Sequence, residues 1–358
     1  MEPVRIGVIG CGVIGSRNLQ SAQESELCEV VAAADLRVDK REWARDEAGV
    51  PRIYEDGRDL LDDDEVEAVI IAFPAGERGA MAMRALARGK HVLLEKPAAM
   101  NAYEVQTMIE WRGEGLAVGC FSARYRACES ARVATEFVAD GGLGEIREIF
   151  FRCFRPAGPP TGKMPPPWRE SFAMNAGGIL TNWSSYDLDY VLGICGWTFR
   201  PRTVLAQTWR CADPFRHAVA PESDADAHFT ALAIGEDGTA LSIERAEFAA
   251  AEQNEVWQIV GSHGTLHLQM LATGKPELVY DDGSDPDAGI VRSTLWQGGD
   301  AKSGGTPWVI DDFAAAIREG RQPMTSLENS LILAQLTDAI YESARTGDAV
   351  RCETIGTP

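Results

Sequence analysis

The sequence has few of the features that mark membrane, metal-binding and disulfide-bonded proteins. No apolar run in its 358 residues approaches the ~20 residues needed to span a bilayer. It has only five histidines, and His263 and His267 lie in a turn-and-strand pattern that does not place them on one helical face, so we expect no metal site. The eight cysteines show no CxxC spacing, which favours reduced thiols over disulfides or a zinc cluster.

Basic residues are also in the minority. The chain has 34 Lys and Arg against 54 Asp and Glu, which gives a formal net charge of −20. An acidic surface disfavours nucleic acid and anionic membranes as partners and favours solubility. The sequence begins almost directly with a strand pattern and shows no signal-peptide pattern, so we expect a cytoplasmic protein that acts on a small molecule.

The most informative stretch is Gly-Cys-Gly-Val-Ile-Gly at residues 10–15. A β-branched strand pattern precedes it at 4–9, and a helix-compatible run follows at 16–25. A second strand pattern at 29–34 ends in Asp35, 20 residues after the third glycine. This order of strand, glycine turn, helix, strand and acid is typical of a dinucleotide-binding βαβ unit. The alternative is an α/β domain with a glycine turn and no ligand.

Each residue of the glycine loop has a physical reason to bind a dinucleotide. Gly10 permits the tight turn, Gly12 lets the backbone approach a pyrophosphate, and Gly15 lets the helix pack close to the strand. The backbone N–H groups of Val13 and Ile14, at the start of the helix, are candidates to bind the phosphates.

The acid after the second strand predicts which cofactor binds. Asp35 can accept hydrogen bonds from a ribose 2′-hydroxyl, and its charge repels a 2′-phosphate, so NAD is expected. Arg37 lies two residues later and is a candidate contact for a 2′-phosphate, which keeps NADP as the less favoured alternative.

The pattern of elements divides the chain into two domains of the α/β class. Residues 1–122 alternate strands and helices, as expected for a parallel, doubly wound sheet, and residues 123–358 contain successive strands with short turns, as expected for a mainly antiparallel sheet. In the first part we expect strands at 66–73, 91–94 and 116–121 and helices at 79–88 and 102–112. In the second we expect helices at 131–139, 180–192, 309–318 and 327–343, strands at 146–154, 227–234, 240–248 and 256–260, and loops at 156–167 and 281–302.

Several motifs resemble one oxidoreductase family. The stretch Gly-Lys-His-Val-Leu-Leu-Glu-Lys-Pro at 89–97 looks like the central motif of the glucose–fructose oxidoreductase / inositol dehydrogenase / rhizopine-catabolism (Gfo/Idh/MocA) family. Residues 118–125, 168–169 and 177–189 resemble further landmarks of that family. The resemblance implies an N-terminal Rossmann domain (1–122), and a C-terminal α/β domain (123–358) with an open, mainly antiparallel sheet for substrate binding and oligomerisation. It also implies an NAD-dependent oxidoreductase that forms a homodimer or homotetramer through that sheet.

The resemblance also implies a site. Lys96 would be the cation that stabilises a developing alkoxide, and Pro74, Glu95 and Lys96 would lie at the cofactor. Relatives commonly have an aspartate and a histidine where this chain has Asn182 and Tyr186, and some sugar oxidoreductases and dihydrodiol dehydrogenases use a tyrosine at the second position.

The two substituted positions predict the proton chemistry. They lie four residues apart in a predicted helix, hence on one face. Tyr186 would be the acid/base, helped by a nearby cation that favours its phenolate, and Asn182 would orient the substrate hydroxyl or the phenol. Alternatively, Tyr186 is a core or interface aromatic residue, Asn182 is an ordinary polar helix residue, and Lys96 only pairs with an acid such as Glu95.

Three more residues are candidate substrate contacts beside Lys96, Asn182 and Tyr186. They are Arg124, Trp168 and Arg169. Trp168 would stack on a sugar or the nicotinamide, or only seal the domain junction; the two arginines would contact hydroxyl groups, or be ordinary ion-pair partners.

Four functions fit these residues. The first is hydride transfer between NAD and a secondary hydroxyl of a sugar, glycoside or cyclitol. The others are redox-neutral elimination or epimerisation with retained NAD, a catalytically silent ligand sensor, and an interaction scaffold. Retention of Lys96 and a suitable tyrosine argues against the sensor.

Overall fold

The chain folds into two compact units in the computed structural model, which describes residues 2–160, 162, 165–271, 275–298 and 305–352. The first unit contains residues 1–124 and 305–331, and the second contains residues 125–304 and 332–358. Residues 305–331, which the predicted boundary at 122/123 assigned to the second domain, pack with the first unit because Ile310 and Phe313 join its apolar core. How nucleotide and substrate divide between the two domains stays a prediction.

The first unit is built on a parallel sheet with strand order β3-β2-β1-β4-β5-β6. Its strands are short, and all but the edge strand β3 are mostly buried on both faces, as is typical of parallel sheets. The strands are β1 (Val4–Ile9), β2 (Cys28–Ala34), β3 (Arg52–Tyr54), β4 (Ala68–Ile71), β5 (His91–Leu94) and β6 (Val118–Cys120). This arrangement confirms the predicted Rossmann fold.

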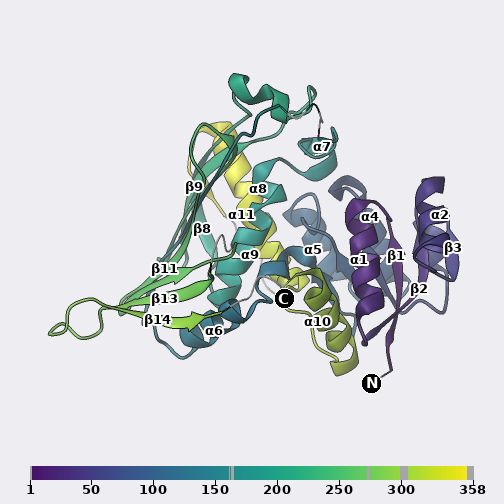
Figure 1. Ribbon diagram of the computed structural model, residues 1–358, viewed down its shortest axis with the longest axis horizontal. Coiled ribbons are helices and arrows are strands. Elements are labelled where there is room, and N and C mark those ends of the chain that lie inside the picture. Colours follow the sequence, from purple (N-terminus) through teal and green to yellow (C-terminus); the bar gives the residue numbers. More distant parts are fainter. Residues whose placement is uncertain (1, 161, 163–164, 272–274, 299–304, 353–358) are drawn as a thin grey trace. The chain divides into compact units, whose positions relative to one another are not determined.

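Helices cover both faces of this sheet, because right-handed crossovers that run in opposite directions place their helices on opposite sides. Helices α1 and α10 pack together on one side, and α4 and α5 pack together on the other (Figure 1). The helices are α1 (Val13–Glu24), α2 (Val38–Asp46), α3 (Gly57–Leu61), α4 (Ala75–Ala87), α5 (Ala102–Trp111) and α10 (Thr306–Glu319). The short 3₁₀ helix η1 (Phe121–Tyr125) follows β6.

The second unit is built on a nine-stranded mixed sheet with order β14-β13-β12-β11-β7-β10-β9-β8-β15. Among the described strand pairs of this nine-stranded sheet only β7–β10 is parallel, so the predicted mainly antiparallel sheet is confirmed. The strands are β7 (Ile146–Pro156), β8 (Pro201–Trp209), β9 (His228–Gly235), β10 (Ala240–Ala249), β11 (Asn254–Gly261), β12 (Gly264–Leu268), β13 (Glu277–Asp282), β14 (Val291–Gln297) and β15 (Val350–Arg351).

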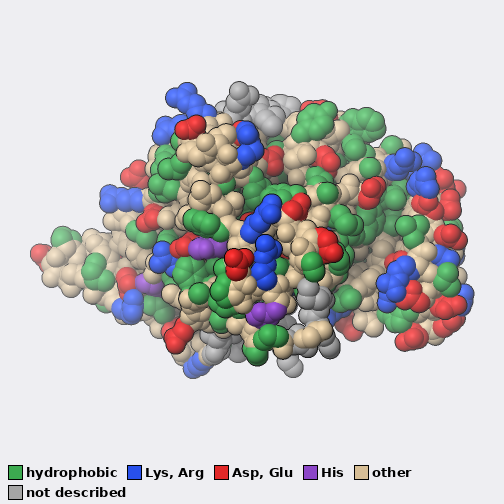
Figure 2. Space-filling view, turned by 90° about the horizontal axis from the view of Figure 1, so that it is seen from above, with side chains coloured by type: hydrophobic (Ala, Val, Ile, Leu, Met, Phe, Trp, Pro, Cys, Tyr) green, Lys and Arg blue, Asp and Glu red, His purple; other side chains and the backbone are tan. Residues whose placement is uncertain are grey.

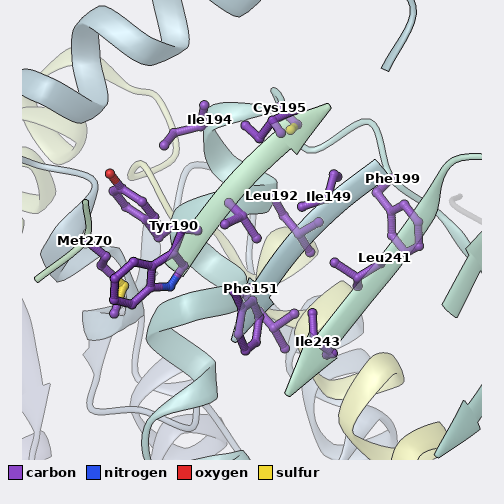
Figure 3. Packing of buried hydrophobic residues seen from close by; sticks show 14 of the residues in the cluster. Ile149, Phe151, Tyr190, Leu192, Ile194, Cys195, Phe199, Leu241, Ile243 and Met270 are labelled. Carbon is purple, nitrogen blue, oxygen red and sulfur yellow. The ribbon is translucent and has the colours of Figure 1, made fainter. Parts of the chain in front are cut away.

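One face of the nine-stranded sheet is covered by helices (Figure 1). Figure 3 shows side chains of β7 and β10, such as Phe151 and Ile243, in one apolar cluster with Tyr190 and Leu192 of α9. The helical elements of this unit are α6 (Glu129–Ala139), α7 (Phe172–Asn175), α8 (Ile179–Asn182), α9 (Ser184–Ile194) and η2 (Asp213–Ala218), and α11 (Leu327–Thr346) enters it from the first unit.

Two predictions for the second unit are wrong. Residues 281–302 were expected to be a loop, but β14 (Val291–Gln297) pairs with β13 within this segment; residues 299–302 lie outside the described residues. The single helix expected at 180–192 is two helices, because the chain breaks at Trp183, which has φ −110° and ψ −40°.

The described residues show other general features. No helix among them is long and apolar enough to cross a membrane, and no group of three or more His, Cys, Asp or Glu is placed to hold a metal ion. All eight cysteines are unpaired thiols. Acidic and basic side chains lie interspersed on the face drawn in Figure 2.

Candidate functional site

The glycine loop has the geometry that a dinucleotide needs. Gly10 adopts φ +92°, a left-handed conformation that favours glycine. A Cβ atom on Gly15 would lie 1.7 Å from the carbonyl oxygen of Gly10, so only glycine lets α1 start this close to β1. A Cβ atom on Gly12 would meet nothing within 4 Å, which leaves open space beside the backbone.

The start of α1 is suited to an anion. The helix begins at Val13, so Val13 and Ile14 form its first turn, and this turn contains no acidic residue. No side chain caps the helix among the described residues, and the N-cap position is Gly12. An uncapped helix N-terminus offers N–H groups and a partial positive charge to a pyrophosphate.

Asp35 lies directly beside this loop. Its Oδ2 accepts a hydrogen bond from the backbone N–H of Cys11 at 2.7 Å, and its Oδ1 accepts one from the N–H of Arg37 at 2.8 Å. The guanidinium of Arg37 pairs with Asp39 at 2.8 Å. Arg37 is therefore held by an acid of its own, and the carboxylate nearest the loop is Asp35. Together, the open cradle at Gly12, the uncapped helix and Asp35 fit an NAD molecule.

Lys96 follows the carboxyl end of β5, the edge at which such sheets bind ligands. Its backbone N–H donates to Oε2 of the buried Glu95 at 3.2 Å. The other carboxylate oxygen of Glu95 accepts a hydrogen bond from Asn18 of α1 at 3.0 Å and lies 3.8 Å from the guanidinium of Arg124. The structure thus brings Lys96, Glu95 and Arg124 together in one unit and ties them to the helix of the glycine loop.

Arg78 is a buried residue of this site that is not among the predicted site residues. It lies in α4, whose N-cap residue is Pro74. Its guanidinium donates to the carbonyl oxygens of Phe73 at 2.5 Å, Glu95 at 2.8 Å and Pro97. These three carbonyl groups belong to the segments that follow β4 and β5. Arg78 therefore joins the two loops that carry Pro74 and Lys96.

The glycine pair at 177–178 has a packing reason in the second unit. A Cβ atom on Gly177 would lie 1.9 Å from the hydroxyl of Tyr341, and one on Gly178 would lie 1.9 Å from the carbonyl oxygen of Asp226. Asp226 accepts hydrogen bonds from three successive N–H groups at the start of α8: Gly178 through Oδ1 at 2.9 Å, Ile179 through its carbonyl at 2.8 Å, and Leu180 through Oδ2 at 3.0 Å. Burial raises the pKa of Asp226. This one residue fixes the short helix that ends at Asn182.

Asn182 and Tyr186 lie on either side of the break at Trp183. Asn182 is half-buried at the end of α8, and Tyr186 is 5% exposed in α9. The ring of Tyr186 contacts those of Trp183 (centroids 5.8 Å apart) and Tyr125 (5.3 Å apart). The two residues are therefore in adjacent helices and not in one continuous helix, as the sequence pattern had indicated.

Trp168 and Arg169 lie in a turn at 167–170. Trp168 is 40% exposed, and the guanidinium of Arg169 pairs with Glu247 at 2.8 Å and lies 3.3 Å from Glu170. Burial raises the pKa of Glu170 to about 7, although Arg169 lowers it. The structure shows Arg169 as an ion-pair partner, and its contact with a substrate stays a prediction.

Family models match both units of the chain. Residues 4–114 match GFO_IDH_MocA, described as an oxidoreductase family with an NAD-binding Rossmann fold, and residues 131–267 match the GFO/IDH/MocA C-terminal domain. The two ranges together cover more than half of the 358 residues.

Curated relatives include several named dehydrogenases. The chain is 25% identical to the myo-inositol 2-dehydrogenase of Thermotoga maritima over 53% of this chain and 55% of that protein, so it matches about half of that relative's length. It is 24% identical to D-xylose 1-dehydrogenase (NADP(+)) 2 of Haloferax volcanii over 97% of this chain and 99% of that protein. It is 23% identical to scyllo-inositol 2-dehydrogenase (NAD(+)) of Bacillus subtilis over 98% and 96%.

Solved structures share the fold. A levoglucosan dehydrogenase in complex with NADH has a TM-score of 0.84 and 21% identity, with 99% of this chain and 100% of that chain covered. An NAD binding oxidoreductase from Klebsiella pneumoniae has a TM-score of 0.82 and 24% identity, with 98% and 99% covered.

Proposed function

The chain belongs to the GFO/IDH/MocA oxidoreductase family, as its motifs predicted, and on this premise we propose that it transfers a hydride between NAD and a secondary hydroxyl of a sugar, glycoside or cyclitol. The observation that carries the proposal is Lys96 at the carboxyl end of β5, in the same unit as the glycine loop and Asp35. The names of the curated inositol and xylose dehydrogenases support the substrate class.

The proposed roles follow from the chemistry of alcohol oxidation. NAD, when bound, supplies the hydride acceptor, and the protein must remove the hydroxyl proton and stabilise the oxygen that loses it. In our proposal Lys96 stabilises the developing alkoxide, the phenolate form of Tyr186 accepts the proton and becomes a phenol, and the amide of Asn182 orients the hydroxyl or the phenol without titrating. Arg124, Trp168 and Arg169 are proposed to contact the rest of the substrate.

The experiment is a screen of purified protein for NADH production on a panel of sugars, glycosides and cyclitols, followed by variants. Lys96→Met is expected to lower turnover at least ~10²-fold and to leave NAD binding intact, because the glycine loop is untouched. Lys90→Met is the matched control from the same motif. The Lys90 ammonium donates to the carbonyls of Asp63 and Val66, so its loss is expected to lower stability and not turnover.

Three results would overturn the proposal or one of its assigned roles. Near-normal turnover of the Lys96→Met variant would show that this lysine does not have the proposed catalytic role. Conversion of a substrate without release of NADH would favour redox-neutral chemistry instead. Full activity of Tyr186→Phe would place the proton route elsewhere.

We also propose a cytoplasmic homodimer or homotetramer. The eight unpaired thiols suit a reducing compartment. The nine-stranded sheet has one helix-covered face, and on the strands β8 and β9 Leu205 and Leu232 are register partners that are 51% and 47% exposed. Exposed apolar side chains on an open sheet face support assembly through that face.

A further inference from the structure

Trp183 is the centre of an aromatic triad, which we define as Tyr125, Trp183 and Tyr186. The ring of Trp183 stacks on that of Tyr125 with centroids 6.5 Å apart and planes at 21°. Its edge meets Tyr186 at 5.8 Å and 69°, and Tyr125 meets Tyr186 at 5.3 Å and 89°. Because each ring packs against the other two, a rotation of the Trp183 indole requires the Tyr186 phenol to move as well.

Two arginines from the sheet lie against the Trp183 indole. The guanidinium carbon of Arg155, on β7, is 4.4 Å from the centroid of the ring, and that of Arg245, on β10, is 5.0 Å from it. A guanidinium over an indole is attracted to the electron-rich face of the ring. Arg155 is paired with Glu255 at 3.0 Å and is one-third exposed.

Arg245 is by contrast almost completely buried. It is 1% exposed, and its Nε lies 3.2 Å from Oδ2 of Asp187, the residue that follows Tyr186 in α9. The other oxygen of Asp187 accepts a hydrogen bond from the indole of Trp257 at 3.0 Å. Within the described part of the chain, Nη1 and Nη2 of Arg245 have no hydrogen-bond partner.

The buried ion pair of Arg245 and Asp187 is not expected to contribute much to the stability of the fold. Burying two charges costs about as much as their attraction returns, and two apolar residues of similar size would stabilise the site equally well or better. What a buried pair does provide is a fixed position, since Nε of the guanidinium is paired with Asp187 and its central carbon lies 5.0 Å from the centroid of the Trp183 ring.

We propose that Arg245 is a positioning residue for Tyr186: anchored by Asp187, it holds the Trp183 indole so that the phenol of Tyr186 keeps a single orientation. The inference rests on the proposed role of Tyr186 as the acid/base. It gives a role to the buried charge of Arg245, for which the contacts described above include none with a proposed substrate-binding residue.

The chain offers a matched control at a second aspartate of α9. Arg126, whose side chain is 8% exposed, pairs with the buried Asp189 of α9 at 2.5 Å and has its guanidinium 5.2 Å from the ring of Trp197. Arg126→Met therefore removes an arginine–aspartate pair with α9 and a cation–aromatic contact, but at a different tryptophan.

The first test observes Tyr186 directly, in protein labelled with 3-fluorotyrosine. The Tyr186 fluorine resonance is assigned by its loss in Tyr186→Phe. It is expected to broaden, split or shift in Arg245→Met and in the double variant Arg245→Met/Asp187→Leu, which leaves no unpaired buried charge and so retains a route to a folded protein. Arg126→Met is expected to leave it in place. An unchanged Tyr186 resonance in either folded Arg245 variant overturns the proposal.

The second test separates positioning from general damage. Arg245→Met is expected to lower kcat about ten- to a hundredfold, the scale of a misplaced catalytic group, with less than about a twofold change in the KM for NAD. In a Tyr186→Phe background the same change is expected to have no further effect, because the residue it positions is gone. Equal losses in the two backgrounds overturn the positioning role. Full activity of Tyr186→Phe overturns the proposed proton route, and the fluorine spectra still decide whether Arg245 orients the ring.

Discussion

At the scale of single residues, we predict that Asp35 selects between the two nicotinamide cofactors. It holds the Cys11 N–H of the glycine loop, whereas Arg37 is paired with Asp39. We expect the wild type to bind NAD(H) more tightly than NADP(H). Asp35→Ser is expected to narrow that preference at least about tenfold, because the repulsion of a 2′-phosphate is lost. Fluorescence titrations with NADH and NADPH measure both affinities, and tighter binding of NADPH by the wild type would contradict the prediction.

Glu170 makes stability depend on pH. Burial raises its pKa from 4.5 to about 7, so the folded protein retains a proton that the unfolded chain releases between these values. The stabilising contribution of this proton is complete below the unfolded pKa and is lost as the pH rises through about 7.

The corresponding variant is Glu170→Gln, which keeps the shape of the side chain and cannot ionise. Its melting temperature relative to wild type is expected to rise from about pH 5 to about pH 8, because only the wild type loses stability in that window. Thermal unfolding at several pH values tests this, and parallel curves for the two proteins would show that Glu170 is not the group responsible.

At the scale of elements, the start of α8 depends on two positions that accept only glycine. Gly178→Ala is expected to destabilise the protein by more than about 2 kcal/mol, since the new methyl group would displace the Asp226 backbone that caps the helix. Gly158→Ala is the control, because a Cβ atom there meets nothing within 4 Å. Chemical denaturation of both variants gives the comparison, and equal stabilities would refute the packing argument.

The elements that could be predicted from the sequence are those in which local pattern and tertiary environment agree. The strands around the glycine loop and the β5 segment before Lys96 are mostly apolar, and a buried parallel strand has this pattern. The glycine loop and Lys96 were placed correctly in the fold for the same reason.

The elements that could not be predicted lack such a pattern. Strand β14 is mostly exposed, so it shows no apolar alternation, and α2 buries only Ala44. Trp183, at the break between α8 and α9, packs against residues far away in the sequence, among them Arg155 and Arg245, and such contacts are not visible in a local pattern. The contacts of Arg78 with three carbonyl groups likewise depend on how two loops pack together, and a local sequence pattern does not predict that packing.

At the scale of the whole molecule, the open sheet face predicts assembly. Leu232→Arg would place a charge opposite Leu205 on the exposed face, and we expect it to convert an oligomer into a monomer without unfolding it. Light scattering coupled to size-exclusion chromatography measures the mass. A wild type that is monomeric at all accessible concentrations, or a variant with unchanged mass, would contradict assembly through this face.

The arginine that joins the loops after β4 and β5 has a consequence for the pH dependence that we expect of the enzyme. An arginine keeps its proton throughout the range in which proteins are folded, whereas a histidine changes its charge near neutrality. Arg78 stays positively charged over this pH range, so its hydrogen bonds to the loop that carries Lys96 are expected not to change with pH. We therefore expect NAD affinity to be flat between about pH 6 and pH 8 and to acquire an inflection in Arg78→His, so that this single replacement would turn an acid-indifferent enzyme into an acid-sensing one.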